Sequence, residues 1–245
     1  MWRRFFSYNR ELSNRLHARF PGVFGAVRNY RREIVAAIEA DIARRSHPTV
    51  IECGGVDRPL IPKSPDYRYV GLDIEHRPGC DRVYDDFIVR SIEQPIGVAA
   101  DLVISFTLLE HVRDNEAAIA SIYGALRAGG TTYHYIPSKS HPYSLALRAV
   151  GPTLQKRLIA LLRPAAVEET GYPAFFNRCS PSAMAHLFRQ TGFTNISVSP
   201  FYRANDYFAF FTPAYVAVSL FENAAHALGL RMFCSGFIVS AERPA

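Results

Sequence analysis

The sequence lacks the cysteine arrangements that hold metal ions or disulfide frameworks. Its four cysteines, Cys53, Cys80, Cys179 and Cys234, lie far apart and form no CxxC pair. This spacing argues against a structural zinc site and a disulfide scaffold, and it fits a reducing compartment. Internal repeats and low-complexity tracts are also missing. Since 49% of the 245 residues are hydrophobic, the chain can bury a core and is not a disordered protein.

Long apolar segments are missing too. Residues 1–6 show no apolar core of a signal peptide, and no run reaches the roughly 18 apolar residues that span a bilayer. The longest candidate, from Tyr207 to Phe221, is shorter and is interrupted by Pro213. These absences predict a cytoplasmic protein.

Positive charge is concentrated at the beginning of the chain. The whole sequence has 28 Lys and Arg against 22 Asp and Glu, a net charge of +6. Residues 1–45 hold ten arginines against four acids, which is also +6, so the remainder is neutral. We predict a basic, helical N-terminal arm over residues 1–47 that can meet an anionic membrane surface, a phosphorylated substrate or nucleic acid. A solvated helix face is the alternative.

Short apolar segments alternate with amphipathic ones, which is typical of a parallel, doubly wound α/β sheet. Gly129 and Gly130 are expected to cap the second helix, and the last two strands suggest a closing antiparallel pair. The expected helices cover 28–45, 115–127 and 181–190. The expected strands are 49–52, 69–74, 82–84, 101–106, 131–136, 194–202 and 235–241.

Two apolar, helical segments at 138–179 and 206–232 interrupt this pattern within the main domain, residues 48–245. Both follow strand ends, where lids and substrate pockets are usually built. They are rich in aromatic and aliphatic residues and are flanked by arginines. We expect them to close over a large apolar acceptor or to rest on a membrane surface, unless they simply complete the core.

The ends of the first two strands predict a nucleotide site. Glu52 ends the first strand, and the Gly54-Gly55 turn after it lets a ligand approach the backbone closely. Asp73 ends the second strand, about where a ribose-binding acid stands in dinucleotide folds. A carboxylate at this place can accept hydrogen bonds from both ribose hydroxyls.

The turn also argues against a pyrophosphate-bearing ligand. Val56 and Arg58 stand where NAD-binding and FAD-binding loops carry their second and third glycines, and prolines at 59, 62 and 65 disfavour a helix directly after the turn. A ligand with ribose but no pyrophosphate fits better, and S-adenosylmethionine is the common one.

Four segments carry a recognisable pattern. They run from Val50 to Gly55, from Gly71 to Ile74, from Asp101 to Ser105 with Leu109 to Val112, and from Leu126 to Gly130. In this order and spacing they resemble the class I S-adenosylmethionine-dependent methyltransferases, and the closest branch is the type 11 group, which includes the ubiquinone-biosynthesis O-methyltransferases. The resemblance covers about residues 48–136 and implies a Rossmann-like sheet of about seven strands, the last one antiparallel, with helices on both faces.

Carried over by position, the resemblance assigns Glu52 and the Gly54-Gly55 turn to the methionine end of the cofactor, and Asp73 to the ribose. Phe106 would line the cofactor after the fourth strand. Asp85 would meet the adenine amino group, with Asp86 nearly as good, although a solvated loop pair is the alternative for both.

A metal site is not expected. Some ubiquinone-type relatives complete such a site with a glutamate three residues before the Glu110-His111 pair, and here that position is Thr107. His111 is therefore expected to be structural.

Methyl transfer is an in-line displacement in which the enzyme aligns the nucleophile and excludes water. An oxygen nucleophile often needs a base as well. His141, in the loop after the fifth strand, is the first candidate for this base. His134 and Tyr135 follow, and strand alternation lets only one of them face the site.

The expected acceptor is a small molecule, a glycan or a lipid-linked metabolite, methylated at oxygen. A non-catalytic protein that only binds the cofactor is the second hypothesis, because two motif glycines are missing. A nucleic-acid methyltransferase is the third, but no Asn-Pro-Pro-Tyr motif for base flipping is present.

Overall fold

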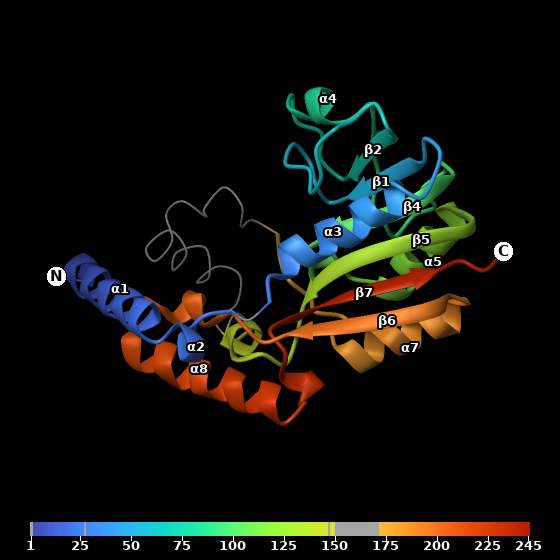
Figure 1. The fold of residues 1–245 in the computed structure, drawn as a ribbon. Helices are drawn as coiled ribbons and strands as arrows, with labels where there is room; N and C mark the ends of the chain where they lie inside the picture. Colours follow the sequence, from blue (N-terminus) through green and yellow to red (C-terminus); the bar gives the residue numbers. More distant parts are fainter. Residues whose placement is uncertain (1, 27, 147, 150–171) are drawn as a thin grey trace. The chain divides into compact units, whose positions relative to one another are not determined.

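The computed structural model describes residues 2–26, 28–146, 148–149 and 172–245, and the chain divides into two compact units (Figure 1). The segments predicted as an arm and as an insertion over 138–179 lie partly outside the described residues. The sheet unit comprises Tyr30–Pro137, Phe175–Ser199 and Phe237–Ala245. The helical unit comprises Met1–Asn29, Ser138–Ala174 and Pro200–Gly236.

Seven strands form one sheet in the order β3-β2-β1-β4-β5-β7-β6. Strand β1 pairs in parallel with β2 and β4, while β3 continues the parallel sheet beside β2 and β5 beside β4. The strands are β1 (Thr49–Cys53), β2 (Arg68–Asp73), β3 (Asp86–Val89), β4 (Ala100–Phe106), β5 (Leu126–Pro137), β6 (Thr194–Phe201) and β7 (Gly236–Glu242).

The sheet closes with antiparallel strands. Gly129 N donates to Arg243 O at 2.9 Å and Arg243 N donates to Gly130 O at 2.8 Å, so the first residues of β5 lie beside the end of β7. The predicted Rossmann-like α/β fold, mostly parallel and closed by antiparallel strands, is confirmed.

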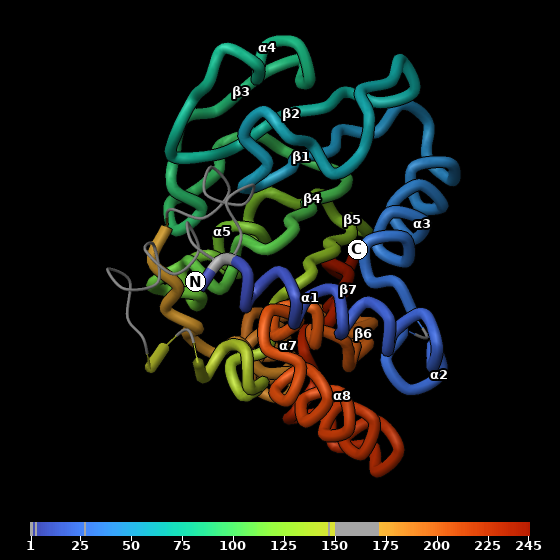
Figure 2. Tube along the Cα trace, turned by 90° about the vertical axis from the view of Figure 1, so that its left-hand side faces the viewer, coloured from blue at the N-terminus to red at the C-terminus, as the bar shows by residue number. Residues whose placement is uncertain are grey.

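Helices cover both faces of the sheet (Figures 1 and 2). On one face lies α3 (Tyr30–Ile42), which buries Ile34 and Ile38. On the other lie α5 (Asn115–Ala125), whose first turn is capped by the Asp114 carboxylate, and α7 (Pro181–Thr191), which begins with proline after Ser180.

Two local predictions are wrong. Residues 82–84 do not form a strand, because α4 (Cys80–Val83) lies there and Tyr84 N closes its helical turn on Cys80 O at 3.0 Å. The third strand comes directly afterwards, at Asp86–Val89. Gly129 and Gly130 do not cap α5 either, since β5 already begins at Leu126.

The helical unit is built from segments far apart in the sequence. Helix α1 (Trp2–Arg19) lies beside α8 (Thr212–Ala227), as Figures 1 and 2 show. Thr212 N donates to Asn9 Oδ1 at 3.0 Å, and Ser13 Oγ donates to Ala209 O at 3.1 Å. The short helices α2 (Pro21–Phe24), η3 (Asn205–Phe208) and η4 (Arg231–Phe233) also belong to this unit.

None of the helices in the described part of the chain is long and apolar enough to cross a membrane.

Candidate functional site

The carboxyl ends of β1, β2, β4 and β5 meet at one edge of the sheet. Cys53 lies opposite Leu72 of β2 and Ser105 of β4, and Phe106 lies opposite Tyr135 of β5. Gly54 N donates to Leu72 O at 2.8 Å, which holds the turn after β1 against the end of β2. The structure thereby brings Gly54, Asp73, Phe106 and Tyr135 to one edge, where open α/β sheets bind ligands.

The two glycines after β1 are required by the packing of the turn. Gly54 has a φ of +85°, and a Cβ there would lie 2.9 Å from Leu108 Cδ1. A Cβ on Gly55 would lie 2.7 Å from Glu52 Oε1. Any larger residue would therefore push the turn away from Leu108 and Glu52.

Glu52 lies under this turn and is almost completely buried. Leu60 N is 3.0 Å from each carboxyl oxygen, and the hydroxyls of Tyr69 and Tyr84 donate to the same group. Burial raises the pKa of Glu52 to about 7, against the opposing effect of these hydrogen bonds and of the Arg31 charge. Its contacts tie the turn to the loop at Leu60, so it positions the site from below.

Asp73 stands at the carboxyl end of β2 with 9% of its surface exposed. Glu75 N donates to Oδ1 at 3.2 Å, and burial raises the pKa of this carboxyl above its ordinary value. A carboxylate offers about four acceptor positions. The group therefore retains acceptor capacity for further donors such as a pair of vicinal hydroxyls.

The structure does not bring Asp85 and Asp86 to this edge. Asp86 begins β3 and lies opposite Val70, whereas Asp73 lies opposite Val89 at the other end of the strand. Both acids have partners where they are. Asp85 accepts from Tyr69 N at 2.8 Å and pairs with Lys63 at 2.8 Å, while Asp86 pairs with Arg68 at 2.6 Å. The sequence predicts these acids at the edge only because it predicts the third strand at residues 82–84, whereas β3 covers Asp86–Val89.

Ser91 and Ile92 lie just beyond the carboxyl end of the third strand, where the sequence predicts Asp85 and Asp86. They follow the carboxyl end of β3, where Arg90 N donates to Asp73 O at 2.8 Å. Ile92 is buried, and Ser91 Oγ accepts from Glu93 N at 3.2 Å. The signal that could have located them is the apolar run from Phe87 to Val89.

Three aromatic rings form a stack at the ends of β4 and β5. The ring of Tyr30, at the start of α3, lies 4.2 Å from that of Tyr135, and the Phe106 ring lies 5.1 Å from that of Tyr135. The guanidinium of Arg31 lies 5.3 Å from the centroid of Phe106. Phe106 and Tyr135 are predicted from the sequence, whereas Tyr30 and Arg31 are not, because they precede the first strand by almost twenty residues.

His134 lies on the opposite face of β5 and is not available as a base. It is fully buried, with Nδ1 2.7 Å from Ser105 Oγ and Nε2 in contact with Thr132 Oγ1. Its ring packs against Phe188 of α7. Burial lowers the pKa of His134 to about 3, so the ring does not take up a proton near neutral pH.

His141 is also unavailable, for a different reason. It lies in the helical unit, is fully buried, and both ring nitrogens are engaged. Nδ1 accepts from Tyr143 N at 3.2 Å, so Nε2 carries the proton and donates to Glu222 Oε1 at 3.1 Å. Of the two predicted catalytic residues that belong to the sheet unit, His134 and Tyr135, only Tyr135 shares the face of Phe106 at the end of β4.

The Glu110-His111 pair lies in the short helix η1 (Leu109–His111). His111 Nε2 is 3.8 Å from Glu110 Oε1, and burial raises the pKa of Glu110 to about 8. No group of three potential metal ligands is gathered in the part of the chain that the structure describes.

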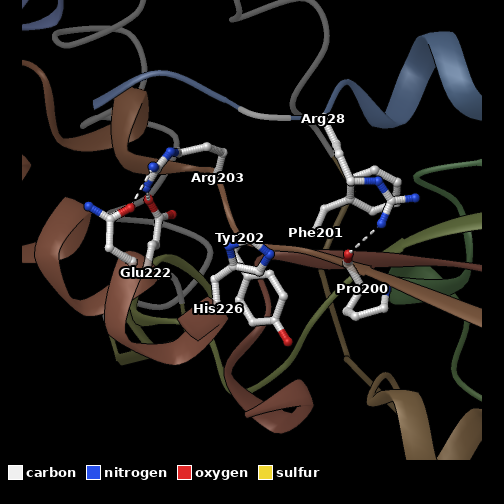
Figure 3. Close-up of a pocket in the computed structure, with 8 residues that line it drawn as sticks. Arg28, Pro200, Phe201, Tyr202, Arg203, Glu222 and His226 are labelled. Carbon is white, nitrogen blue, oxygen red and sulfur yellow. Dashed lines mark hydrogen bonds and ion pairs between the residues drawn. The ribbon is translucent and has the colours of Figure 1, made fainter. Parts of the chain in front are cut away.

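The helical unit contains a shallow pocket between the end of β6 and α8 (Figure 3). The Arg28 guanidinium lies 4.6 Å from the Phe201 ring centroid. Arg203 donates to Glu222 Oε2 at 3.2 Å, to Asn223 Oδ1 at 2.6 Å and to Gly25 O at 2.7 Å. Arg203 thus serves the protein's own acceptors, and the pocket wall is part of the framework of this unit.

Comparison with known families identifies a match over most of the chain. A family model described as a methyltransferase domain matches residues 27–198. A search of curated proteins gives no match.

Solved structures share the fold at low sequence identity. Phosphoethanolamine N-methyltransferase 2 of Haemonchus contortus, in complex with S-adenosyl-L-methionine, has a TM-score of 0.53 and 13% identity, with coverage of 100% of this chain and 60% of that one. The N-methyltransferase NodS of Bradyrhizobium japonicum has a TM-score of 0.51 and 11% identity, covering 88% and 87%. A SAM-dependent methyltransferase from Archaeoglobus fulgidus has a TM-score of 0.52 and 13% identity, covering 87% and 95%. This chain thus spans about three fifths of the length of the Haemonchus protein.

Proposed function

Because this chain belongs to the methyltransferase domain family, we propose that it is an enzyme that transfers a methyl group from S-adenosylmethionine to a small-molecule acceptor. The observation that carries the proposal is the common edge where Gly54, Asp73 and Phe106 lie together. The likeness to the type 11 branch, which includes the ubiquinone-biosynthesis O-methyltransferases, rests on the four sequence segments between Val50 and Gly130, and we include it in this proposal.

The residues at this edge fit the parts of the cofactor. Asp73 would accept hydrogen bonds from the ribose hydroxyls, and Ser91 and Ile92, beside it at the end of β3, would flank the adenine. The Gly54 turn would hold the methionine part, and the Arg31 guanidinium, 5.3 Å from the Phe106 ring centroid, would pair with its carboxylate. When bound, S-adenosylmethionine supplies a methyl group attached to a positively charged sulfur.

The aromatic stack of Tyr30, Phe106 and Tyr135 gives the reaction its surroundings. Aromatic faces attract cations, and the rings exclude water from the edge of the sheet. Glu52 keeps the turn in place through Leu60 N without touching the acceptor. The chain thereby aligns and shields the reacting groups, which is most of what methyl transfer requires.

The choice between an oxygen and a nitrogen acceptor depends on whether the site offers a base. An alcohol needs a base, and the two histidines proposed for this task are buried and fully partnered. A neutral amine attacks through its own lone pair. We therefore include both oxygen and nitrogen acceptors, among them glycan and lipid-linked ones, with Tyr135 as the residue closest to the acceptor.

A second candidate function is binding of the cofactor without catalysis. The observation in its favour is the turn itself, since Val56, at a φ of +47°, and Arg58 replace two motif glycines. This candidate predicts tight cofactor binding with no turnover.

Isothermal titration followed by an acceptor screen tests the proposal. S-adenosylmethionine and S-adenosylhomocysteine should bind, and NAD and ATP should give no heat. A pool of amines and alcohols should then release S-adenosylhomocysteine from the enzyme. Binding without turnover across the pool would favour the second candidate, and tight NAD binding would contradict both.

A further inference from the structure

The two units carry opposite net charges. The helical unit contains 13 Lys and Arg against 5 Asp and Glu, a net charge of +8. The sheet unit contains 15 against 17, a net charge of −2. The whole positive excess of the chain therefore belongs to the helical unit. The predicted basic arm is divided accordingly, since its residues from Tyr30 onward belong to the sheet unit.

Exposed hydrophobic side chains are segregated in the same way. Of the 16 large hydrophobic side chains that are exposed in the described part of the chain, 13 lie in the helical unit. Only Ile74, Val89 and Phe175 lie in the sheet unit. Charge and exposed apolar surface thus coincide on one compact unit, which is the combination found in proteins that attach to membrane surfaces.

Helix α1 presents this combination along one stripe. Its inner stripe, at positions 6, 9, 13 and 16, faces α8 and the residues before it: Phe6 contacts Phe210, and Asn9 and Ser13 bond to this segment. The outer stripe, at positions 5, 8, 12, 15 and 19, lies next to the inner one, has the same helical spacing and is exposed throughout. Phe5, Tyr8 and Leu12 occupy its first half, and Arg15 and Arg19 its second.

The outer stripe has the composition of a membrane-interface helix. Tyr8 exposes 66% of its surface and Phe5 44%. Aromatic rings of this kind settle at the depth of lipid headgroups, while guanidinium groups pair with phosphates. Burial of these rings in the headgroup region removes apolar surface from water at no cost to the inner stripe.

We propose that the helical unit docks on an anionic lipid bilayer through the outer stripe of α1, formed by Phe5, Tyr8, Leu12, Arg15 and Arg19. An anionic surface attracts a unit of charge +8, and the three apolar side chains then enter the headgroup layer. The proposal does not depend on methyl transfer, because none of these residues belongs to the sheet unit. The phosphates of a nucleic acid would also pair with the arginines, but a nucleic acid would offer the aliphatic side chain of Leu12 no suitable apolar surface.

Sedimentation with vesicles tests this surface. The full chain should bind vesicles of phosphatidylcholine with about one third phosphatidylglycerol, bind pure phosphatidylcholine poorly, and dissociate as salt rises. Phe5→Ala/Tyr8→Ala/Leu12→Ala should weaken binding to anionic vesicles at least tenfold. Arg15→Gln/Arg19→Gln should weaken it by about fivefold for each arginine removed.

A matched charge variant serves as the control. Arg82→Gln/Arg189→Gln removes the same charge from exposed positions of the sheet unit and should leave vesicle binding nearly unchanged. Circular dichroism and titration with S-adenosylhomocysteine show whether each variant is folded and keeps its cofactor site.

Three results would overturn the proposal. They are a wild-type chain that ignores anionic vesicles at low salt, a control variant that loses as much binding as the stripe variants, and a triple alanine variant that binds vesicles normally. RNA binding that Arg15→Gln/Arg19→Gln weakens, without vesicle binding by the wild type, would assign the stripe to nucleic acid instead. Loss of cofactor binding alone would count against the proposed function and not against the docking surface.

Discussion

Glu110 shows how strongly burial raises the pKa of a single carboxyl group in this chain. The residue is 4% exposed, and its Oε2 has no hydrogen-bond partner among the described residues. Burial raises its pKa from 4.5 to about 8, so the folded protein keeps it protonated at neutral pH. The stability contributed by the neutral group is complete below about pH 4.5 and is lost as the pH rises through 8.

Replacement of this carboxyl by an amide should flatten the pH dependence of stability. Between about pH 5 and 8, the free energy of unfolding of the wild type should fall, and Glu110→Gln should reduce that fall by about 1 kcal/mol or more. Urea unfolding at several pH values measures it. Little slope should remain below about pH 6.5, since the raised pKa of Glu52 makes stability fall with pH while the lowered pKa of His134 makes it rise over nearly the same range. Equal slopes for Glu110→Gln and wild type would show that the group ionises normally.

Residues at strand ends could be predicted from sequence, whereas the burial and the hydrogen bonds of the histidines could not. Glu52, Gly54, Asp73 and Phe106 directly follow or end apolar runs, so local patterning locates them. The proposed base His141 depends on Glu222, which lies 81 residues away. A contact of this separation leaves no local trace in the sequence, and only the fold shows that the ring is already engaged.

Among the elements, β1, β2, β4 and the helices α3, α5 and α7 could be predicted because each has a clear apolar period. Strand β3 could not be located correctly, because Arg82 to Tyr84 has the same alternation as a short strand but closes a helical turn. This one error led the sequence prediction for the adenine end to Asp85 and Asp86, whereas the residues that follow the carboxyl end of β3, and that we propose for this role, are Ser91 and Ile92.

The turn between β1 and the loop that follows offers a test at the scale of an element. Gly54→Ala should destabilise the protein by about 1 kcal/mol or more and weaken cofactor binding, because the alanine must adopt a φ of +85° against Leu108. Gly124→Ala, inside α5, is the matched control: nothing lies within 4 Å of its Cβ, so it should be neutral or stabilise by about 0.5–1 kcal/mol. Thermal unfolding of both variants measures the difference. Equal effects of the two substitutions would contradict the described turn.

At the scale of the whole molecule, the division into units could not be predicted from sequence. The helical unit combines three separate segments, and the bond from Thr212 N to Asn9 Oδ1 joins residues 203 positions apart. Along the sequence the basic excess lies in residues 1–45. In the structure the excess belongs to the helical unit, which is made of three separate segments of the chain.

Glu222 holds this unit together. It is fully buried, pairs with Arg203 and His141, and accepts from Ala204 N at 2.6 Å. Glu222→Ala leaves the Arg203 charge without its partner, which should cost about 3 kcal/mol or more. Hydrogen exchange should show lost protection in α1 and α8, with the strands of the sheet unit still protected. Glu11→Gln, which removes an exposed ion pair with Arg15, is the control and should change little. Uniform loss of protection across both units would contradict the assignment of Glu222 to the framework of the helical unit alone.

The central claim is that the edge formed by Gly54, Asp73 and Phe106 binds S-adenosylmethionine. Titration calorimetry with S-adenosylhomocysteine on Asp73→Asn and Asp86→Asn tests it most directly, because the two acids stand at opposite ends of the pairing between β2 and β3. Asp73→Asn should weaken binding tenfold or more, since each hydrogen bond to a charged group contributes about 1.5–3 kcal/mol, while the melting temperature of the free protein stays nearly unchanged. Asp86→Asn should bind like the wild type. Unaltered affinity in Asp73→Asn, or an equal loss in Asp86→Asn, would contradict the account.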